Sequence, residues 1–552
     1  MKLINIIPIC LFLRCTQATF LPKYAAPSIP RDAQDISPKN RIKWTRCNLG
    51  IPDLKDSEKA FECGNLTVPL DYTRKSDKRN MILNLIKLKA TKKSPKGSII
   101  VNFGGPGGSG VDGMLSQINT DLADSLFGGQ YDIISFDPRG TGKTLVPPDG
   151  NDFERMSGEL SKTVQNSPLF LAEQLLPEQL MNEAFDYMST FTELFVTRDE
   201  EFREFRGTAF VARDVAEIAT ALGEGNRINY WGISYGTVLG QVLAGMFPGR
   251  IERMLLDGNL LADDYVKDLG LHGTRDAEEA LYHFYDECMA AANNSCHSAS
   301  KLPKERDDFL EALNRVFMVY TGVGGGLGST KSLGLTRVFL QALYDIKGYF
   351  LLDKLIDTAW GGNASMLLQE APDLAGFTTA WNPQFNIAHL AILCSDATFR
   401  AETIKEFKSH FSLYEGNRAL DDPFYLSAML EASPCSRWNI HAAEAINLTS
   451  LSRVETKNPI LLVNGKYDPV TPLGNARKIS ARFPGSQVVV HKGVGHGITS
   501  HPSNCTQEII NRYFISGELP LEETTCEPDL SVFEMLDMSP GLTRKRKIPI
   551  LL

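Results

Sequence analysis

The sequence lacks a long apolar run, an excess of basic residues and a metal-binding cysteine pattern. No stretch of 18 consecutive apolar residues occurs in its 552 residues, so no membrane-spanning helix is expected. Its 57 lysines and arginines are outnumbered by 66 aspartates and glutamates, and the net charge of -9 argues against a nucleic-acid-binding protein. It contains no Cys-x-x-Cys and no histidine cluster beside a cysteine, so we expect no metal site.

The first residues are typical of a secretion signal. Lys2 gives a positive start, residues 4–13 are mostly apolar, and residues 16–18 offer small side chains for cleavage. We therefore expect a signal peptide at residues 1–18 and an extracellular, secreted protein; an uncleaved anchor or a buried segment is the alternative. Sequons agree with export and mark candidate glycosylation sites at Asn65, Asn293, Asn363, Asn447 and Asn504.

Eight cysteines remain once the signal is removed, and an even number in an exported chain indicates four disulfides. Eight cysteines allow about 105 pairings, so the connectivity stays open. The simplest hypothesis joins neighbours in the sequence, which gives Cys47–Cys63, Cys288–Cys296, Cys394–Cys435 and Cys505–Cys526.

Short segments rich in Val and Ile, ended by Gly or Pro, alternate with segments of helical periodicity. This alternation predicts an α/β fold, a mostly parallel sheet with helices on both faces. Helices are expected at 208–222 and 235–247. The expected strands lie at residues 81–90, 98–103, 131–137, 227–233, 251–257, 459–464 and 487–491.

About 200 residues between the expected strands at 251–257 and 459–464 have a mainly helical pattern, clearest at 276–292 and 306–320. Because strand-like segments resume afterwards, we interpret the block as an insertion over the sheet, with a tandem domain as the alternative. The basic run at 544–547 is either a solvated tail or a processing site. The expected parts are a signal (1–18), an N-terminal arm (19–80), a core (81–258), a helical cap insertion (259–458), a second core part (459–530) and a basic tail (531–552).

Residues 232–236 read Gly-Ile-Ser-Tyr-Gly between an apolar strand and an apolar helix. Such a tight strand-to-helix turn exposes a serine hydroxyl, and glycines on either side avoid backbone clashes. Ser234 is therefore the candidate nucleophile; a small-residue turn without chemistry is the alternative.

A serine nucleophile needs a base, and in this arrangement the acid and then the histidine follow it along the chain. Asp468 comes directly after a late strand, and His496 lies in a glycine-rich loop after the next strand. His491 and His501 are the alternative bases, and a plain turn aspartate is the alternative for Asp468. The predicted histidine takes the serine proton, while the aspartate holds the imidazole tautomer.

The glycine-rich stretch at 103–110 follows an early strand and would let backbone N–H groups approach a substrate oxyanion. Tyr235, the residue after the nucleophile, is predicted to give one N–H, and Gly105 the other, with Gly104 as second choice. A phosphate loop is the competing interpretation, but the stretch lacks the terminal Gly-Lys-Ser/Thr. The stretch at 140–144 ends in Gly-Lys-Thr without the first glycine at the required spacing. No metal or organic cofactor is implied, because a triad and an oxyanion loop suffice for acyl transfer.

Taken together, these motifs resemble the α/β-hydrolase peptidases of the prolyl iminopeptidase and tripeptidyl aminopeptidase group. The matching stretches, in the family's order, are 104–110, 136–142, 230–236, 256–258, 468–472 and 495–497. The resemblance implies an α/β-hydrolase fold with a large helical cap, a TAP-like C-terminal region bearing the acid and the histidine, and a secreted exopeptidase acting at peptide N-termini. Phe103 stands where prolyl iminopeptidases have a histidine, which argues against strict proline specificity.

An aminopeptidase must bind a free α-amine, and a carboxylate in the cap could accept it. Asp396 and Glu431 are the candidates, each with a solvated or structural acid as the alternative. The sequence thus predicts a serine aminopeptidase acting on peptide or small acyl substrates, with no nucleic-acid partner. The alternatives are an esterase, lactonase or thioesterase with the same triad, or a noncatalytic binding protein on this scaffold.

Overall fold

The computed structural model describes residues 42–47, 60–144, 181–182, 185–186, 192, 202–291, 295–320, 330–360, 383–413 and 423–538. The chain divides into Met1–Lys39 and Asn40–Leu552, and every described residue belongs to the second unit. The expected signal peptide and the basic run at 544–547 lie outside the described residues. Within the described ranges, no helix is long and apolar enough to cross a membrane.

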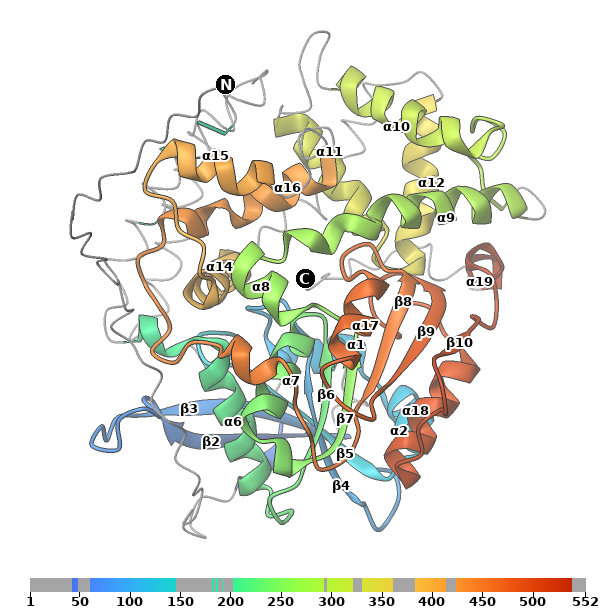
Figure 1. The fold of residues 1–552 in the computed structure, drawn as a ribbon. Helices are drawn as coiled ribbons and strands as arrows, with labels where there is room; N and C mark the ends of the chain where they lie inside the picture. The colour runs from blue at the N-terminus through green and yellow to red at the C-terminus, as the bar shows by residue number, and fades with distance from the viewer. Residues whose placement is uncertain are drawn as a thin grey trace, which may run out of the picture. The chain divides into compact units, whose positions relative to one another are not determined.

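A ten-stranded sheet runs through the described part of the chain, in the order β1-β2-β3-β5-β4-β6-β7-β8-β9-β10 (Figure 1). The pairs β1·β2, β2·β3 and β3·β5 are antiparallel, and every other pair is parallel. The prediction of a mostly parallel α/β sheet is confirmed. The strands are β1 Thr45–Arg46, β2 Phe61–Pro69, β3 Asn80–Leu88, β4 Gly97–Asn102, β5 Tyr131–Phe136, β6 Ile228–Ile233, β7 Ile251–Asp257, β8 Leu461–Tyr467, β9 Gln487–Val494 and β10 Thr524–Cys526.

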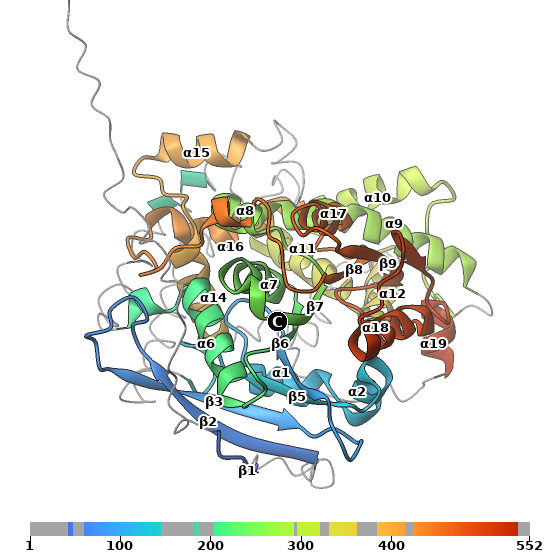
Figure 2. The same ribbon diagram turned by 60° about the horizontal axis from the view of Figure 1, so that its bottom comes forward.

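Helices cover both faces of this sheet (Figures 1 and 2). Successive side chains of a strand point to opposite faces, and on β6 Tyr230 joins the cluster of α6 and α7 while Trp231 joins that of α2 and α18. All six residues of β6 are therefore buried. The helices are α1 Gly110–Gln117, α2 Thr120–Phe127, α6 Thr208–Ala221, α7 Tyr235–Met246, α17 Leu473–Ser480, α18 Asn504–Ser516 and α19 Val532–Met538.

The described helices between β7 and β8 are called the cap below, and Figure 1 shows most of them grouped above the sheet. Part of the cap has its own apolar core, in which Phe284 and Tyr349 are fully buried. The helices are α8 Ala262–Asp268, α9 Ala277–Ala290, α10 Arg306–Tyr320, α11 Thr330–Ala342, α12 Ile346–Trp360, α14 Pro383–Asp396, α15 Ile404–Leu413 and α16 Pro423–Ala432.

The structure corrects two of the expected boundaries. Residues 19–80 were expected to be an N-terminal arm outside the core, but β2 pairs with β3 along its whole length and buries Leu66 and Val68. The alternation of apolar and polar residues shifts by one position within β2. A search of the sequence for a two-residue period therefore misses this strand. The expected tail from residue 531 begins with α19, whose Phe533 packs against Phe284 of α9.

Four disulfides are present among the described residues, and they join the pairs that the sequence hypothesis proposed: Cys47–Cys63, Cys288–Cys296, Cys394–Cys435 and Cys505–Cys526. The bond closing the longest loop spans 41 residues and ties α14 to the segment after α16. Such closures reduce the freedom of the unfolded chain. The sequon asparagines Asn65, Asn447 and Asn504 are exposed, whereas Asn293 and Asn363 lie outside the described residues.

A buried ion pair fixes the loop after β5. Arg139 donates from Nε and Nη2 to the Asp214 carboxylate of α6 at 2.7 and 2.6 Å. Its Nη1 donates to the carbonyls of Leu70 and Phe205, and Tyr72 donates to Asp214 at 2.7 Å. Since the two charges are almost fully buried and amply hydrogen-bonded, removing one would leave the other uncompensated.

The substitution Asp214→Ala should therefore lower the free energy of unfolding by roughly 3–5 kcal/mol. Urea unfolding followed by circular dichroism measures the effect. Arg453→Ala is the matched control, because the Arg453–Glu455 pair is largely exposed and should change stability by less than about 1 kcal/mol. Equal effects of the two substitutions would show that the buried ion pair contributes no more to the free energy of unfolding than the exposed one.

Candidate active site

The turn from β6 to α7 holds Ser234 in an unusual backbone conformation, with φ 60° and ψ -125°. A residue other than glycine seldom adopts a positive φ, and such strain is typical of functional turns. The Ser234 N–H donates to the Asp257 carbonyl at 2.9 Å. A β-carbon on Gly232 would lie 2.2 Å from the Gly236 carbonyl oxygen, so the sharp turn requires glycine there.

Asp468 follows β8, and its buried carboxylate is fully engaged. Its Oδ1 accepts the N–H groups of Val470 and Thr471 at 3.0 and 2.9 Å. Its Oδ2 accepts the Thr471 hydroxyl at 2.6 Å and lies 2.8 Å from His496 Nδ1. This set of donors fixes the carboxylate and orients the imidazole.

His496 lies in the loop after β9, which is held from two sides. On the cap side, the His496 N–H donates to the Tyr344 carbonyl at 2.8 Å, and the Tyr344 ring meets the imidazole edge-on at 5.4 Å. On the core side, the Ile498 N–H donates to the Asp257 carboxylate at 3.1 Å. The cap and the sheet therefore jointly position this histidine.

The environment of His496 makes it a base that is easily protonated. Burial alone would lower the pKa of His496, but the charge and hydrogen bond of Asp468, with a contribution from Asp257, raise it above its ordinary value. Its Nε2 is buried without a hydrogen-bond partner in the described part of the chain. A contact between serine and histidine often tightens only when substrate binds.

The two alternative histidines lie elsewhere and are differently engaged. Burial, with the charge of His501, lowers the pKa of His491 to about 4, and its Nδ1 contacts the Thr506 hydroxyl. His501 has both ring nitrogens in hydrogen bonds, to the Val494 N–H and the Leu530 carbonyl. Of these three histidines, His496 is the one that lines a cavity together with Ser234.

The glycine-rich loop after β4 lies against the serine turn. The Gly104 N–H donates to the Asn102 side chain at 3.1 Å, which commits that N–H to the loop itself. A β-carbon on Gly104 would lie 2.6 Å from the Ile233 carbonyl, so the approach needs glycine. Gly105 lines the cavity beside Ser234, which favours it over Gly104 as the oxyanion donor.

A cavity of about 610 Å³ connects these elements. Its walls come from the glycine loop, the serine turn, the histidine loop and the cap, in particular the turn between α11 and α12. That turn presents Asp345 and Tyr344 to the cavity, and the end of α11 presents Gln341. The Gln341 Nε2 is buried and has no hydrogen-bond partner in the described ranges. The volume suits a small organic or peptide ligand.

Asp396 does not line this cavity. Its buried carboxylate accepts the N–H and hydroxyl of Thr208 at 3.0 and 2.5 Å and the Tyr265 hydroxyl at 3.2 Å. Burial raises the pKa of Asp396 to about 6, although the hydrogen bonds from Thr208 oppose the rise. Since Thr208 also contacts the Tyr235 hydroxyl, Asp396 ties the cap to the residue after Ser234. This placement favours a structural role over amine binding.

Glu431, the other expected amine-binding acid, belongs to α16, and its side chain lies outside the described residues. The sequence analysis missed Asp345, which the structure brings to the cavity. Asp345 is followed directly by α12, and its Oδ1 accepts the Gly348 N–H at 2.8 Å, as a helix cap does. A capping aspartate carries no signal in the sequence that would distinguish it from any other.

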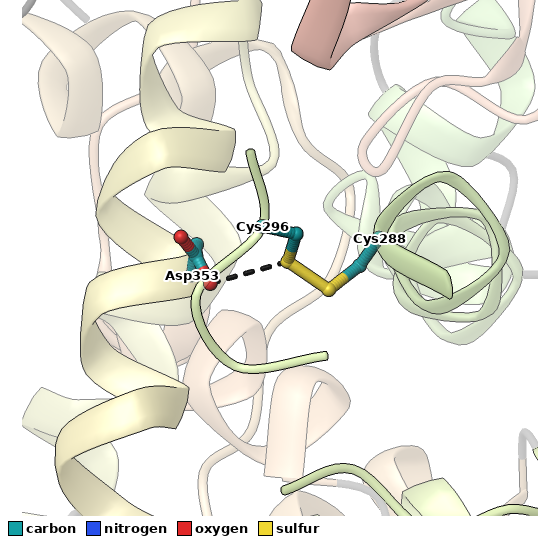
Figure 3. A group of neighbouring side chains, drawn as sticks. All are labelled: Cys288, Cys296 and Asp353. Atoms are coloured by element: carbon teal, nitrogen blue, oxygen red, sulfur yellow. Dashed lines mark hydrogen bonds between the residues drawn. A yellow bond between two sulfur atoms is a disulfide. The ribbon is translucent and has the colours of Figure 1, made fainter. Parts of the chain in front are cut away.

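One group of side chains in the described residues has the spacing of a cation site: Cys288, Cys296 and Asp353 (Figure 3). The two sulfurs form a disulfide, so neither is the thiolate that a metal needs. The Asp353 carboxylate accepts the N–H groups of His297 and Ser298 at 3.0 and 2.8 Å. The group is therefore a disulfide that lies beside a carboxylate, and that carboxylate is hydrogen-bonded to the backbone.

Comparison with known families covers both parts of the site. A family model described as the alpha/beta hydrolase fold matches residues 97–278, which contain Ser234. A second model, described as TAP-like protein, matches residues 422–526, which contain Asp468 and His496.

Similar proteins span nearly the whole chain. A tripeptidyl aminopeptidase of Streptomyces lividans is 26% identical, over 88% of this chain and 87% of its own. The serine protease Hip1 of Mycobacterium tuberculosis H37Rv is 25% identical, over 88% and 91%. A protein named carboxylesterase B, from Mycobacterium tuberculosis CDC 1551, is 25% identical, over 88% and 90%.

Fold and similarity together define a serine hydrolase of the α/β-hydrolase fold. The match to the TAP-like model at residues 422–526 and the similarity to tripeptidyl aminopeptidases support the resemblance seen in its motifs.

The raised pKa of His496 can be measured directly. Because Asp468 stabilises the imidazolium, the His496 ring should titrate above the ordinary value of about 6.5 in nuclear magnetic resonance spectra. The signal is assigned by its loss in His496→Gln. Asp468→Asn should lower this pKa, whereas His491 should stay neutral down to about pH 4. A His496 pKa below 6.5 in the unaltered protein would contradict the contact between His496 and Asp468.

Proposed function

We propose that the protein is a secreted serine exopeptidase that cleaves peptide bonds at the amino terminus of its substrates. Ser234, His496 and Asp468 form the catalytic triad in this proposal. The observation that carries it is that Ser234 and an Asp468-bound His496, from distant parts of the chain, line one cavity under the cap.

The arrangement suits acyl transfer through a covalent intermediate. Ser234 attacks the carbonyl carbon while His496 Nε2 takes its proton, and the N–H groups of Tyr235 and Gly105 stabilise the oxyanion. His496 then gives the proton to the leaving amine, which departs and leaves the acyl-enzyme. Water, deprotonated by His496, releases the acid product and regenerates the serine. Asp468 holds the imidazole tautomer throughout.

The cap supplies groups that match a peptide's amino terminus. Asp345 is the carboxylate among the described cavity residues, and it is a charged acceptor suited to an α-ammonium group. The buried Gln341 Nε2, which has no hydrogen-bond partner among the described residues, is a donor suited to a peptide carbonyl. These two groups, four residues apart in the sequence, support an amine-binding subsite at the α11–α12 turn. The relatives named as peptidases are consistent with it.

Export to the extracellular space is part of the proposal. It is supported by the apolar N-terminal stretch, by the four disulfides and by exposed sequon asparagines, which are the candidate glycosylation sites.

A second candidate function is hydrolysis of a small-molecule ester, lactone or thioester. The same triad would serve it, since amides and esters pass through the same acyl-enzyme. The similarity to a protein named carboxylesterase B favours this candidate.

A matched substrate panel distinguishes the two functions. The purified protein is given free-amine aminoacyl and tripeptidyl amides, the same amides with a blocked amine, and acyl esters. We expect cleavage of the free-amine amides, at least about tenfold slower cleavage of the blocked ones, and loss of both with Ser234→Ala, because removing the nucleophile ends covalent catalysis. Cleavage of esters alone would support the second function and reject the first.

Asp345→Asn tests the amine subsite. For free-amine amides it should raise KM by roughly tenfold or more, the value of one charge-assisted hydrogen bond, with little effect on esters. Asp357→Asn is the matched control, because Asp357 lies on α12 and pairs with Lys301 outside the cavity. Equal effects of the two substitutions would exclude Asp345 as the amine acceptor.

A further inference from the structure

Asp257, at the end of β7, contacts the backbone beside both candidate catalytic residues. Its carbonyl accepts the Ser234 N–H at 2.9 Å, inside the strained serine turn. Its carboxylate accepts the Ile498 N–H at 3.1 and 3.3 Å, two residues beyond His496. One residue therefore joins the nucleophile turn to the histidine loop, which are more than 250 residues apart in the sequence.

The side chain of Asp257 is buried between the sheet and the histidine loop. It is 1% exposed, accepts the Ile498 N–H and also interacts with the Trp231 side chain of β6. The loop passes close to it, since a β-carbon on Gly497 would lie 3.6 Å from its Oδ2. A β-carbon on the next residue of the chain, Gly258, would lie 3.1 Å from the His496 imidazole. A larger residue at Gly258 would push on the imidazole, whereas the distance at Gly497 is an ordinary van der Waals contact.

The charge of Asp257 also acts on the imidazole. Burial raises the pKa of Asp257 to about 7, while the charge of His496 and the Ile498 N–H oppose the rise. The charge of Asp468 adds to the rise by like-charge repulsion. In return, Asp257 contributes to the raised pKa of His496. The charged groups that face Asp257 in the described structure are thus His496 and Asp468.

We infer that Asp257 is a positioning residue for the proposed base: its carboxylate holds the histidine loop against the serine turn and supplies a second negative charge beside His496. Asp468 orients the imidazole through Nδ1, whereas Asp257 fixes the backbone that carries it. The inference rests on the proposed triad but not on the choice between peptide and ester substrates.

The test compares Asp257→Asn with Asp257→Ala, using p-nitrophenyl acetate, a small ester that needs only the nucleophile, the base and the oxyanion donors. Asparagine keeps an acceptor for the Ile498 N–H and should retain kcat within about tenfold. Alanine removes it, and a misplaced base should lower kcat roughly a hundredfold. Rates are divided by the concentration of sites labelled by a fluorophosphonate, so that unfolded protein does not count. Full kcat in Asp257→Ala would overturn the positioning role.

The pH profile distinguishes the effect of the Asp257 charge from the effect of its packing, and it requires only the variant Asp257→Asn. The base must be neutral, so activity falls as pH drops through the pKa of His496. Without the second carboxylate, Asp257→Asn should move the acidic limb of kcat/KM to lower pH by about half a unit or more. Asp214→Asn, a change to a buried structural carboxylate on α6, should leave the limb in place. If the acidic limb of kcat/KM does not move in Asp257→Asn, the inference that the charge of Asp257 acts on His496 is wrong.

Ser234→Ala keeps the two hypotheses distinguishable. If it still hydrolyses the ester, the proposed triad fails whatever Asp257 does. If it is inactive while both Asp257 variants behave like the unaltered protein, the triad stands and the inference about Asp257 is wrong.

Discussion

The 2.8 Å contact between His496 Nδ1 and Asp468 Oδ2 is the interaction on which the rest of the site depends. A buried histidine would otherwise lose basicity, because burial disfavours its charged form. The contact requires two loops to meet at one edge of the sheet, and the parallel register of β8 and β9 brings them there. Thr471 fixes the carboxylate and the Tyr344 carbonyl fixes the loop, so the imidazole is held before any substrate arrives.

The cap is part of this arrangement as well as a cover. Its α11–α12 turn bonds the histidine loop through Tyr344 and also presents Asp345 to the cavity. Its helix α14 reaches the serine turn through Asp396, Thr208 and the Tyr235 hydroxyl. Movement of the cap would therefore disturb the serine turn and the histidine loop together.

Much of this architecture follows from the sequence, because buried parallel strands are continuous apolar runs. The run expected at 251–257 is β7 with the same limits, and the Gly-x-Ser-x-Gly pattern specifies its own turn through the close approach at Gly232. The strand β2 was missed, because its alternation of apolar and polar residues shifts by one position midway. Asp396 was expected at the amine-binding site but is buried against Thr208, whereas Asp345, for which nothing was predicted, lines the cavity. The position of a side chain in a helical insertion depends on tertiary packing that local sequence does not encode.

The most direct test of the central claim, that Ser234 is the nucleophile activated by this site, is to label the folded protein with a fluorophosphonate and locate the adduct by peptide mass spectrometry. The account predicts one adduct, on Ser234, with activity lost in proportion to labelling, and no adduct in urea-unfolded protein. An adduct on another residue that tracks the loss of activity, or an active enzyme that remains unlabelled, would contradict it.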